Sequence, residues 1–196
     1  NLQCTFCPEV IRAKKRMDID LFERVIQQIA PLTDQVGLHL MGEPLLHPKL
    51  QEMVEICSNY NTRIFLVSNG VLLREKHQEV LKNPIFRQIC FSLHSYPDNF
   101  GQRDPTVYLN RIFDFTDTML NVRPELYLNF RLWNIQDVRG ASSSNIDMLQ
   151  QISNRYNKTL DVDHFDLRRG KSIRIIGRLY LHFDTEFTWP SLDIPI

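Results

Sequence analysis

Residues 63–70 read RIFLVSNG, and this stretch indicates the class of fold. Its core, residues 64–67, is an apolar run without polar alternation, which is typical of a parallel strand that is covered on both faces. The polar turn at residues 68–70 follows it, and a helical pattern comes next over about residues 73–83. A strand, a turn and a helix in this order form one βα unit, the building block of α/β proteins.

The same alternation extends in both directions from this unit. Helices are expected over about residues 18–31, from 47 onward, and over 73–83, 104–121 and 144–156. Strands are expected over about residues 36–41, 63–68, 88–94, 126–134 and 178–183. This order predicts an α/β fold with a parallel sheet, in one domain over residues 1–196.

The composition is that of an ordinary globular protein. Hydrophobic residues make up 43% of the chain, and its 23 Lys and Arg residues balance 23 Asp and Glu residues. A neutral chain has no overall attraction to phosphate backbones, which counts against nucleic-acid binding. No apolar run approaches the length of about 20 residues that crosses a bilayer, and the first residues lack signal-peptide features. We therefore expect a cytoplasmic protein without a membrane partner.

Two of the four cysteines form the pair Cys4 and Cys7, in the sequence CTFC. A CxxC motif serves zinc sites, thioredoxin-like dithiols and iron–sulfur clusters. A zinc site would need two further ligands from a second closely spaced pair, and the sequence has no other CxxC or HxxxH pair. A thioredoxin motif would follow a strand. Cys57 and Cys90 fall within apolar patterns, so we expect them to be buried structural thiols.

Residues 126–134 read LYLNFRLWN and alternate between apolar and polar or aromatic side chains. One face of this strand is expected to pack, and the other to line a binding cavity. Arg131 lies on the cavity face, where a guanidinium needs an anion: the carboxylate of a ligand or, more simply, Glu43 or a nearby Asp. Asn129 and Asn134 are secondary candidates for binding a ligand.

Several segments, in the right order, resemble the radical S-adenosylmethionine (SAM) superfamily. They are NLQCTFC (1–7), similar to its CxxxCxxC motif; HLMGEPLLHP (39–48), similar to its GGEP segment; LVSNGVLL (66–73); and FSLHS (91–95). The first cysteine of the motif would sit immediately before Asn1. The closing FTWPSLD (187–193) resembles the lead into the SPASM extension of some members. The resemblance implies a partial (β/α)6 TIM-like barrel that lacks its first strand, in a core domain truncated at both ends.

The resemblance also implies the metal ligands. Cys4 and Cys7 would be two of three thiolates on a [4Fe–4S] cluster, which leaves the fourth iron for the amino and carboxylate groups of SAM. Phe6 matches the family's aromatic residue beside the cluster. The implied SAM-binding residues are Phe6, Gly42, Glu43, Ser68, Asn69, Ser92 and Arg131.

Each of these segments also has a plainer interpretation. Met41 to Pro44 ends a predicted strand, at the sheet edge where α/β folds bind ligands, but this sequence also suits an ordinary turn. Gly42 permits close approach of a ligand, and Glu43 can accept a hydrogen bond from the SAM ammonium group. The turn at residues 68–70 is equally compatible with plain loop geometry. His94 is more simply a satisfied hydrogen-bonding residue.

The implied activity is reductive cleavage of SAM to methionine and a 5′-deoxyadenosyl radical, which abstracts hydrogen from a peptide, protein or small-molecule substrate. An electron donor is then a required partner. One alternative is an RNA-modifying radical SAM enzyme, which predicts a basic groove. Another is a noncatalytic scaffold without a cluster. The basic residues Arg12, Lys14, Lys15 and Arg16 are expected to form a solvated face.

Overall fold

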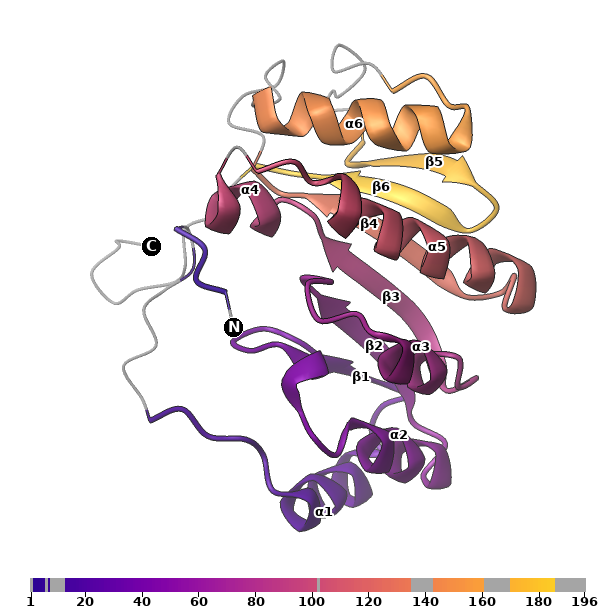
Figure 1. Ribbon diagram of the computed structural model, residues 1–196. Helices are drawn as coiled ribbons and strands as arrows, with labels where there is room; N and C mark the ends of the chain where they lie inside the picture. Colours follow the sequence, from indigo (N-terminus) through magenta and orange to yellow (C-terminus); the bar gives the residue numbers. More distant parts are fainter. Residues whose placement is uncertain are drawn as a thin grey trace.

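A six-stranded sheet forms the centre of the protein in the computed structural model, which describes residues 2–5, 7, 13–101, 103–134, 143–160 and 170–185. In chain order the strands are β1 (Gln35–Leu38), β2 (Arg63–Ser68), β3 (Phe86–Ser92), β4 (Tyr127–Leu132), β5 (Ser172–Ile176) and β6 (Leu179–Phe183). Their order in the sheet is β1-β2-β3-β4-β6-β5 (Figure 1). All pairs are parallel except β5 with β6. The α/β class and the predominantly parallel sheet are confirmed.

Helices connect the strands as the βα pattern predicts. They are α1 (Ile19–Ile29), the 3-10 helix η1 (Pro44–Leu46), α2 (Leu50–Asn59), α3 (Glu75–Leu81), α4 (Ser95–Phe100), α5 (Thr106–Val122) and α6 (Ser143–Tyr156). The Asp18 side chain caps α1 by accepting from the backbone N–H of Asp20 and Leu21, as its N-cap position predicts. Among the described residues, no helix combines the length and apolarity that a membrane crossing requires.

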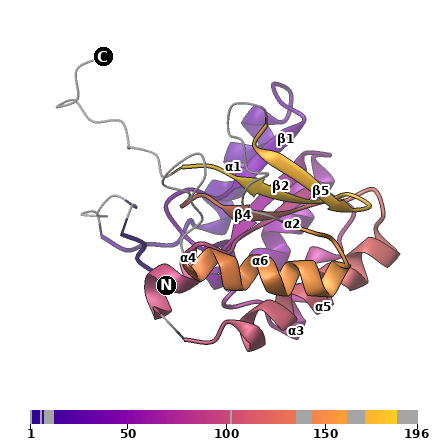
Figure 2. The same cartoon turned by 90° about the horizontal axis from the view of Figure 1, so that it is seen from above.

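The helices cover one face of the sheet and leave the other partly open (Figures 1 and 2). In β4, and in β2 after the exposed Arg63, the residues alternate between buried and half-buried. The buried set includes Ile64, Leu66, Leu128 and Phe130, which join the main hydrophobic core. The expectation that both faces of β2 are covered is therefore only partly met, because Phe65 and its neighbours on the second face stay half-exposed. We call this second face the inner face.

Three elements were not predicted from the sequence: the 3-10 helix η1, helix α4 and strand β5. Helix α4 spans only six residues and contains Pro97, so it offers no periodic pattern long enough to detect. Strand β5 forms a tight hairpin with β6, and Gly177 in the turn takes a φ of +51°, which glycine tolerates best. The hairpin makes β5 the one antiparallel strand among the described residues.

Arg123 stabilises the connection between α3 and β3, where strand β3 begins. Its side chain, 12% exposed, donates hydrogen bonds of 2.7–3.3 Å to four backbone carbonyls in the α3–β3 connection. These carbonyls belong to Lys82, Asn83, Pro84 and Phe86. The guanidinium also pairs with Glu125. The guanidinium thus provides hydrogen-bond donors for backbone carbonyls at the point where the chain leaves α3 and enters β3.

We expect Arg123→Ala to lower the free energy of unfolding by about 2 kcal/mol, because it removes several charge-assisted hydrogen bonds at once. Urea denaturation measures this change. Lys82→Ala is the control, since it removes only an exposed pair with Glu79 and should cost less than about 0.5 kcal/mol. Equal effects from the two variants would show that the carbonyl contacts contribute nothing.

Candidate functional site

The loops after β1 and β2 are joined by Glu43. Its Oε1 accepts from the Ser68 hydroxyl at 2.8 Å and from the Leu45 backbone N–H at 3.1 Å, while its Oε2 accepts from the Asn69 backbone N–H at 2.8 Å. Burial raises the pKa of the Glu43 carboxyl, and these three hydrogen bonds oppose the rise. The carboxylate is largely occupied by the protein itself, so its first role is to hold the two loops together at the C-terminal edge of the sheet.

The turn at residues 68–70 is closed by its own side chains. The Ser68 hydroxyl accepts from the Gly70 N–H at 2.9 Å, and Asn69 Oδ1 accepts from the Val71 N–H at 3.0 Å. Gly70 has a φ of +73°, and a Cβ there would lie 2.7 Å from Ile112. Glycine at position 70 therefore has a packing reason as well as a conformational one.

Gly42 has no such internal reason. A Cβ added to Gly42 would meet no atom of the described chain within 4 Å. Leu40, two residues earlier, is 65% exposed and has a φ of +93°, a conformation that costs energy for a residue with a Cβ. Strain and free space together at the end of β1 are typical of a backbone that approaches a ligand.

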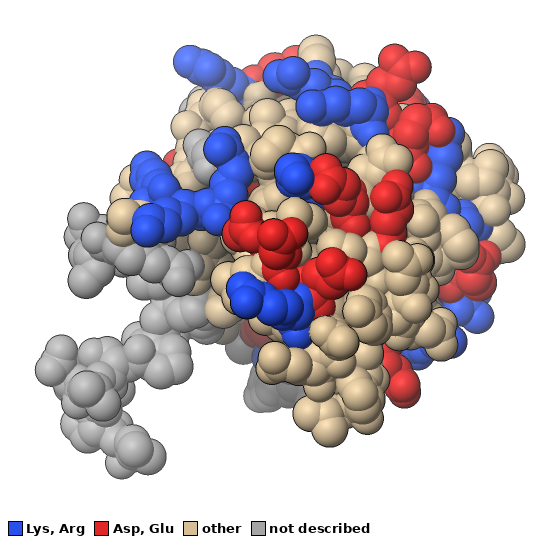
Figure 3. Space-filling model, turned by 90° about the horizontal axis from the view of Figure 1, so that it is seen from below, with Lys and Arg blue, Asp and Glu red and all other residues tan. Residues whose placement is uncertain are grey.

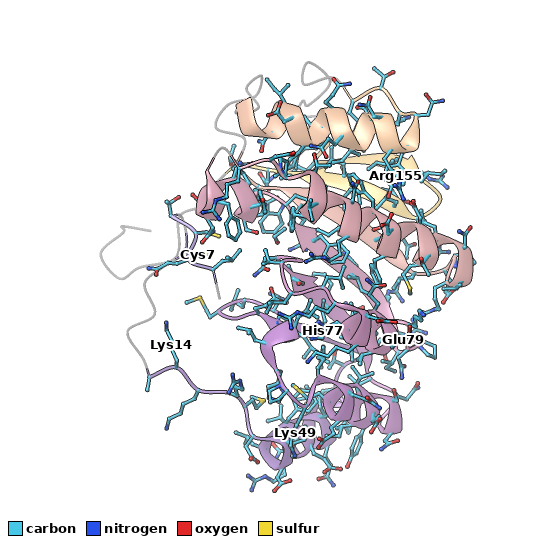
Figure 4. The ribbon with its side chains drawn as sticks, in the orientation of Figure 1. Cys7, Lys14, Lys49, His77, Glu79 and Arg155 are labelled. Atoms are coloured by element: carbon cyan, nitrogen blue, oxygen red, sulfur yellow. The ribbon has the colours of Figure 1, made fainter. Side chains whose placement is uncertain are left out.

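Cys4 and Cys7 lie together beside this edge. The Cys7 N–H donates to the Cys4 carbonyl at 3.1 Å, and the two thiols interact directly. Burial and the neighbouring Cys7 raise the pKa of Cys4 to about 12, while burial chiefly raises that of Cys7. Figure 4 shows Cys7 next to α4. Phe6 lies outside the described residues.

Two soft donors side by side suit iron or zinc, but two cannot hold either metal alone. Within the described part of the chain, no group of three or more His, Cys, Asp or Glu side chains is arranged to bind a metal ion. A metal centre at Cys4 and Cys7 therefore needs at least one ligand from beyond this set.

Arg131 occupies the inner face, as the alternation of β4 predicts. Its guanidinium lies 4.5 Å from the Trp133 ring centre and 5.4 Å from that of Phe65. Its Nε atom is buried and has no hydrogen-bond partner, and no ion pair among the described residues includes Arg131. The predicted alternative, a salt bridge to Glu43 or a nearby Asp, is absent from the described residues.

Among the described residues, two histidines and the Cys90 thiol, rather than acids, lie near Arg131. Burial first, and then the Arg131 charge, lower the pKa of His39 and of His182. The lowered pKa values favour neutral imidazoles near pH 7. The sequence analysis did not single out His39 or His182. The alternation LYLHF in β6, which matches that of β4, was the available signal for His182.

The remaining candidates divide into inner-face and structural residues. Ser92 is half-buried and pairs with Arg131 across the β3–β4 ladder. Asn129 is also half-buried on the inner face. Asn134, in contrast, exchanges two amide hydrogen bonds of 3.1 and 2.9 Å with Asn145 of α6, so it serves the packing of that helix.

His94 is likewise structural. It stands at the start of α4, and its Nδ1 lies 3.1 Å from the Arg131 carbonyl oxygen and 3.2 Å from the Trp133 backbone nitrogen. Burial chiefly lowers its pKa to about 4. Cys57 and Cys90 are buried in the interior, as predicted.

A half-open parallel sheet, with a thiol pair and two polar loops at its C-terminal edge, defines an α/β protein of the barrel type. The family model of the radical SAM superfamily matches residues 1–125. The chain therefore belongs to the radical SAM superfamily. No curated protein matches the sequence.

Solved structures with the same fold include SuiB of Streptococcus suis. SuiB bound to its precursor peptide SuiA has a TM-score of 0.55 and 15% identity, over 79% of this chain and 34% of that chain. SuiB bound to S-adenosylmethionine has a TM-score of 0.55 and 15% identity, over 95% and 45%. An archaeal TYW1 has a TM-score of 0.44 and 20% identity, over 76% and 58%. The chain thus spans less than half of SuiB.

We expect Glu43→Gln to loosen the two loops, because a side-chain NH2 group would face N–H and O–H donors. Hydrogen exchange at the Asn69 amide should become faster, and the free energy of unfolding should fall by about 1–3 kcal/mol. Glu55→Gln is the control, since Glu55 is exposed on α2, where its carboxylate accepts from the Gln51 side chain. An unchanged exchange rate at Asn69 would show that other contacts hold the loops.

Proposed function

We propose that the protein is a radical SAM enzyme in which Cys4 and Cys7 supply two of three thiolates to a [4Fe–4S] cluster. The observation that carries this proposal is that α4 holds the thiol pair at the same edge of the sheet as the loops joined by Glu43. When bound, the cluster and SAM supply a 5′-deoxyadenosyl radical by reductive cleavage. The chain's own residues bind and orient the cofactor and exclude water from it.

The residues present fit these groups. Thiolates are the ligands that iron–sulfur clusters use, and the free space at Gly42 suits a backbone that lies along a cofactor. We assign Gly42, Glu43, Ser68, Asn69 and Ser92 to the SAM side of the site. For Glu43, one lone pair of Oε2 is left to accept from an ammonium group, since the other contacts serve the loops.

Arg131 is assigned to a carboxylate, that of SAM in the first instance. Arg131 has a buried Nε without a hydrogen-bond partner, and no carboxylate of the described residues pairs with it; its neighbours are His39, His182 and the Cys90 thiol. Such a guanidinium favours an anion. The Phe65 and Trp133 rings lie against the guanidinium and limit the rotamers it can adopt, which favours binding of both oxygens of one carboxylate.

A peptide, protein or small molecule is the proposed substrate, and an electron donor the proposed partner. SuiB, which shares the fold, was solved with a precursor peptide, and the half-buried aromatic residues of the inner face suit side chains of such a substrate. Figure 3 shows acidic and basic side chains interspersed on the face it draws, where an RNA-binding surface would gather basic ones. Lys14 and Lys15 are exposed, as expected of a solvated segment (Figure 4).

Anaerobic iron–sulfide reconstitution tests the proposal on a chain extended by a cysteine immediately before Asn1. The reconstituted protein, given SAM and a reductant, should release 5′-deoxyadenosine. Cys4→Ala and Cys7→Ala should each abolish stable iron binding, because a cluster corner loses its ligand. Cys57→Ala is the control and should keep its iron, since Cys57 is buried in the core. Full iron content in Cys4→Ala would contradict the ligand assignment.

Arg131→Lys should raise the Kd for SAM by about tenfold or more, since a lysine cannot reproduce a two-pronged contact with a carboxylate. Equilibrium dialysis of the reconstituted protein measures this. Arg87→Lys, at an exposed position of β3, should leave the Kd unchanged. If Arg131→Lys leaves the Kd for SAM unaltered but weakens binding of the substrate, Arg131 binds the substrate and not SAM.

A further inference from the structure

Four hydrogen bonds tie residues 3–5 to helix α4. Asp98 accepts from the Thr5 N–H at 2.6 Å and from the Thr5 hydroxyl at 2.9 Å. Asn99 Oδ1 accepts from the Gln3 N–H at 2.9 Å, and Asn99 Nδ2 donates to the Cys4 sulfur at 3.5 Å. These contacts join positions more than 90 residues apart in the chain, so they place the cysteine segment on the sheet edge.

Helix α4 is itself held firmly. The Ser95 hydroxyl donates to the Ser92 carbonyl at 2.6 Å, which fixes α4 to the end of β3. Tyr96 stacks on Tyr108 of α5, with ring centres 4.5 Å apart. The Tyr108 hydroxyl in turn donates to the Asn69 carbonyl at 2.8 Å. The cysteine segment is thus fastened to an element that also contacts the loop after β2.

Asn99 is the one residue of this helix that reaches a candidate metal ligand with a donor. Its amide N–H also donates to the Ser95 carbonyl at 2.9 Å, which holds the amide plane in one orientation. An N–H donor on a cluster thiolate withdraws negative charge from the sulfur. It therefore favours the reduced, more negative state of a cluster.

We propose that Asp98 and Asn99 are positioning residues for the cluster: Asp98 fixes the backbone of the cysteine segment, and Asn99 sets the reduction potential through its hydrogen bond to Cys4. This inference rests on the proposed function, since it requires a cluster on Cys4. The Asn99 carbonyl oxygen holds Gln3 while its amide nitrogen contacts the sulfur, so the two roles reside on different atoms of one side chain.

Asn99→Asp separates these two roles. It keeps an oxygen for the Gln3 N–H but removes the donor to Cys4 and adds a negative charge beside the sulfur. In the reconstituted, cysteine-extended chain, the reduction potential should become more negative while iron content and amide exchange at Gln3 stay unchanged. Potentiometric titration followed by electron paramagnetic resonance measures the potential. Asn110→Asp is the matched control, because Asn110 is exposed on α5 and its change carries the same charge. An Asn99→Asp potential equal to that of Asn110→Asp would overturn the role of Asn99.

Asp98→Ala tests, in the absence of any cluster, whether Asp98 holds residues 3–5 against α4. Amide hydrogen exchange at Thr5 should become faster in the metal-free chain, and the reconstituted variant should lose iron more quickly to a chelator. Unchanged exchange at Thr5 would overturn the role of Asp98. If the parent chain binds no cluster, the proposed function fails, whereas the exchange measurement still decides whether α4 holds the segment.

Discussion

In the part of the chain that the structure describes, helices cover one face of the sheet, and the rest of the described structure follows from this constraint. On the covered face, branched and aromatic side chains close-pack into one core. On the inner face, every second residue of β2, β4 and β6 is half-buried and many are polar or aromatic. A barrel whose interior was filled by aliphatic side chains would have no room for a ligand. On this inner face Arg131, Asn129 and His182 are only half-buried.

The edge of the sheet is built as one connected unit. Glu43 joins the loops after β1 and β2, and the Asn69 carbonyl receives the Tyr108 hydroxyl of α5. Tyr108 stacks on Tyr96 of α4, and α4 holds the cysteine segment. Residues from five separate parts of the chain thus fix one another, which is how a site keeps its geometry without a ligand.

Local sequence patterns predicted much of the fold, but they did not predict the contacts between residues of the candidate site. Strand β2 was predicted with its observed bounds, and the alternation in β4 placed Arg131 correctly. Helix α4 could not be predicted, because six residues with a proline give no periodicity. For the same reason Asp98 and Asn99 went unnoticed, since only the folded chain brings them to residues 3–5. The partners of Glu43 also could not be predicted from the sequence. A ligand or Arg131 was expected to contact its carboxylate, whereas in the structure Ser68 and Asn69 do so.

The aromatic surroundings of Arg131 have a consequence for selectivity. A free arginine side chain samples many rotamers, and ordering it opposes any association. Here the rings of Phe65 and Trp133 already restrict the guanidinium plane. The edge of a flat, fixed cation recognises planar anions whose two oxygens match its spacing, and it discriminates against a lone halide or an alcohol by shape as well as charge. If Arg131 binds a carboxylate as proposed, less side-chain motion would have to be lost when that carboxylate binds.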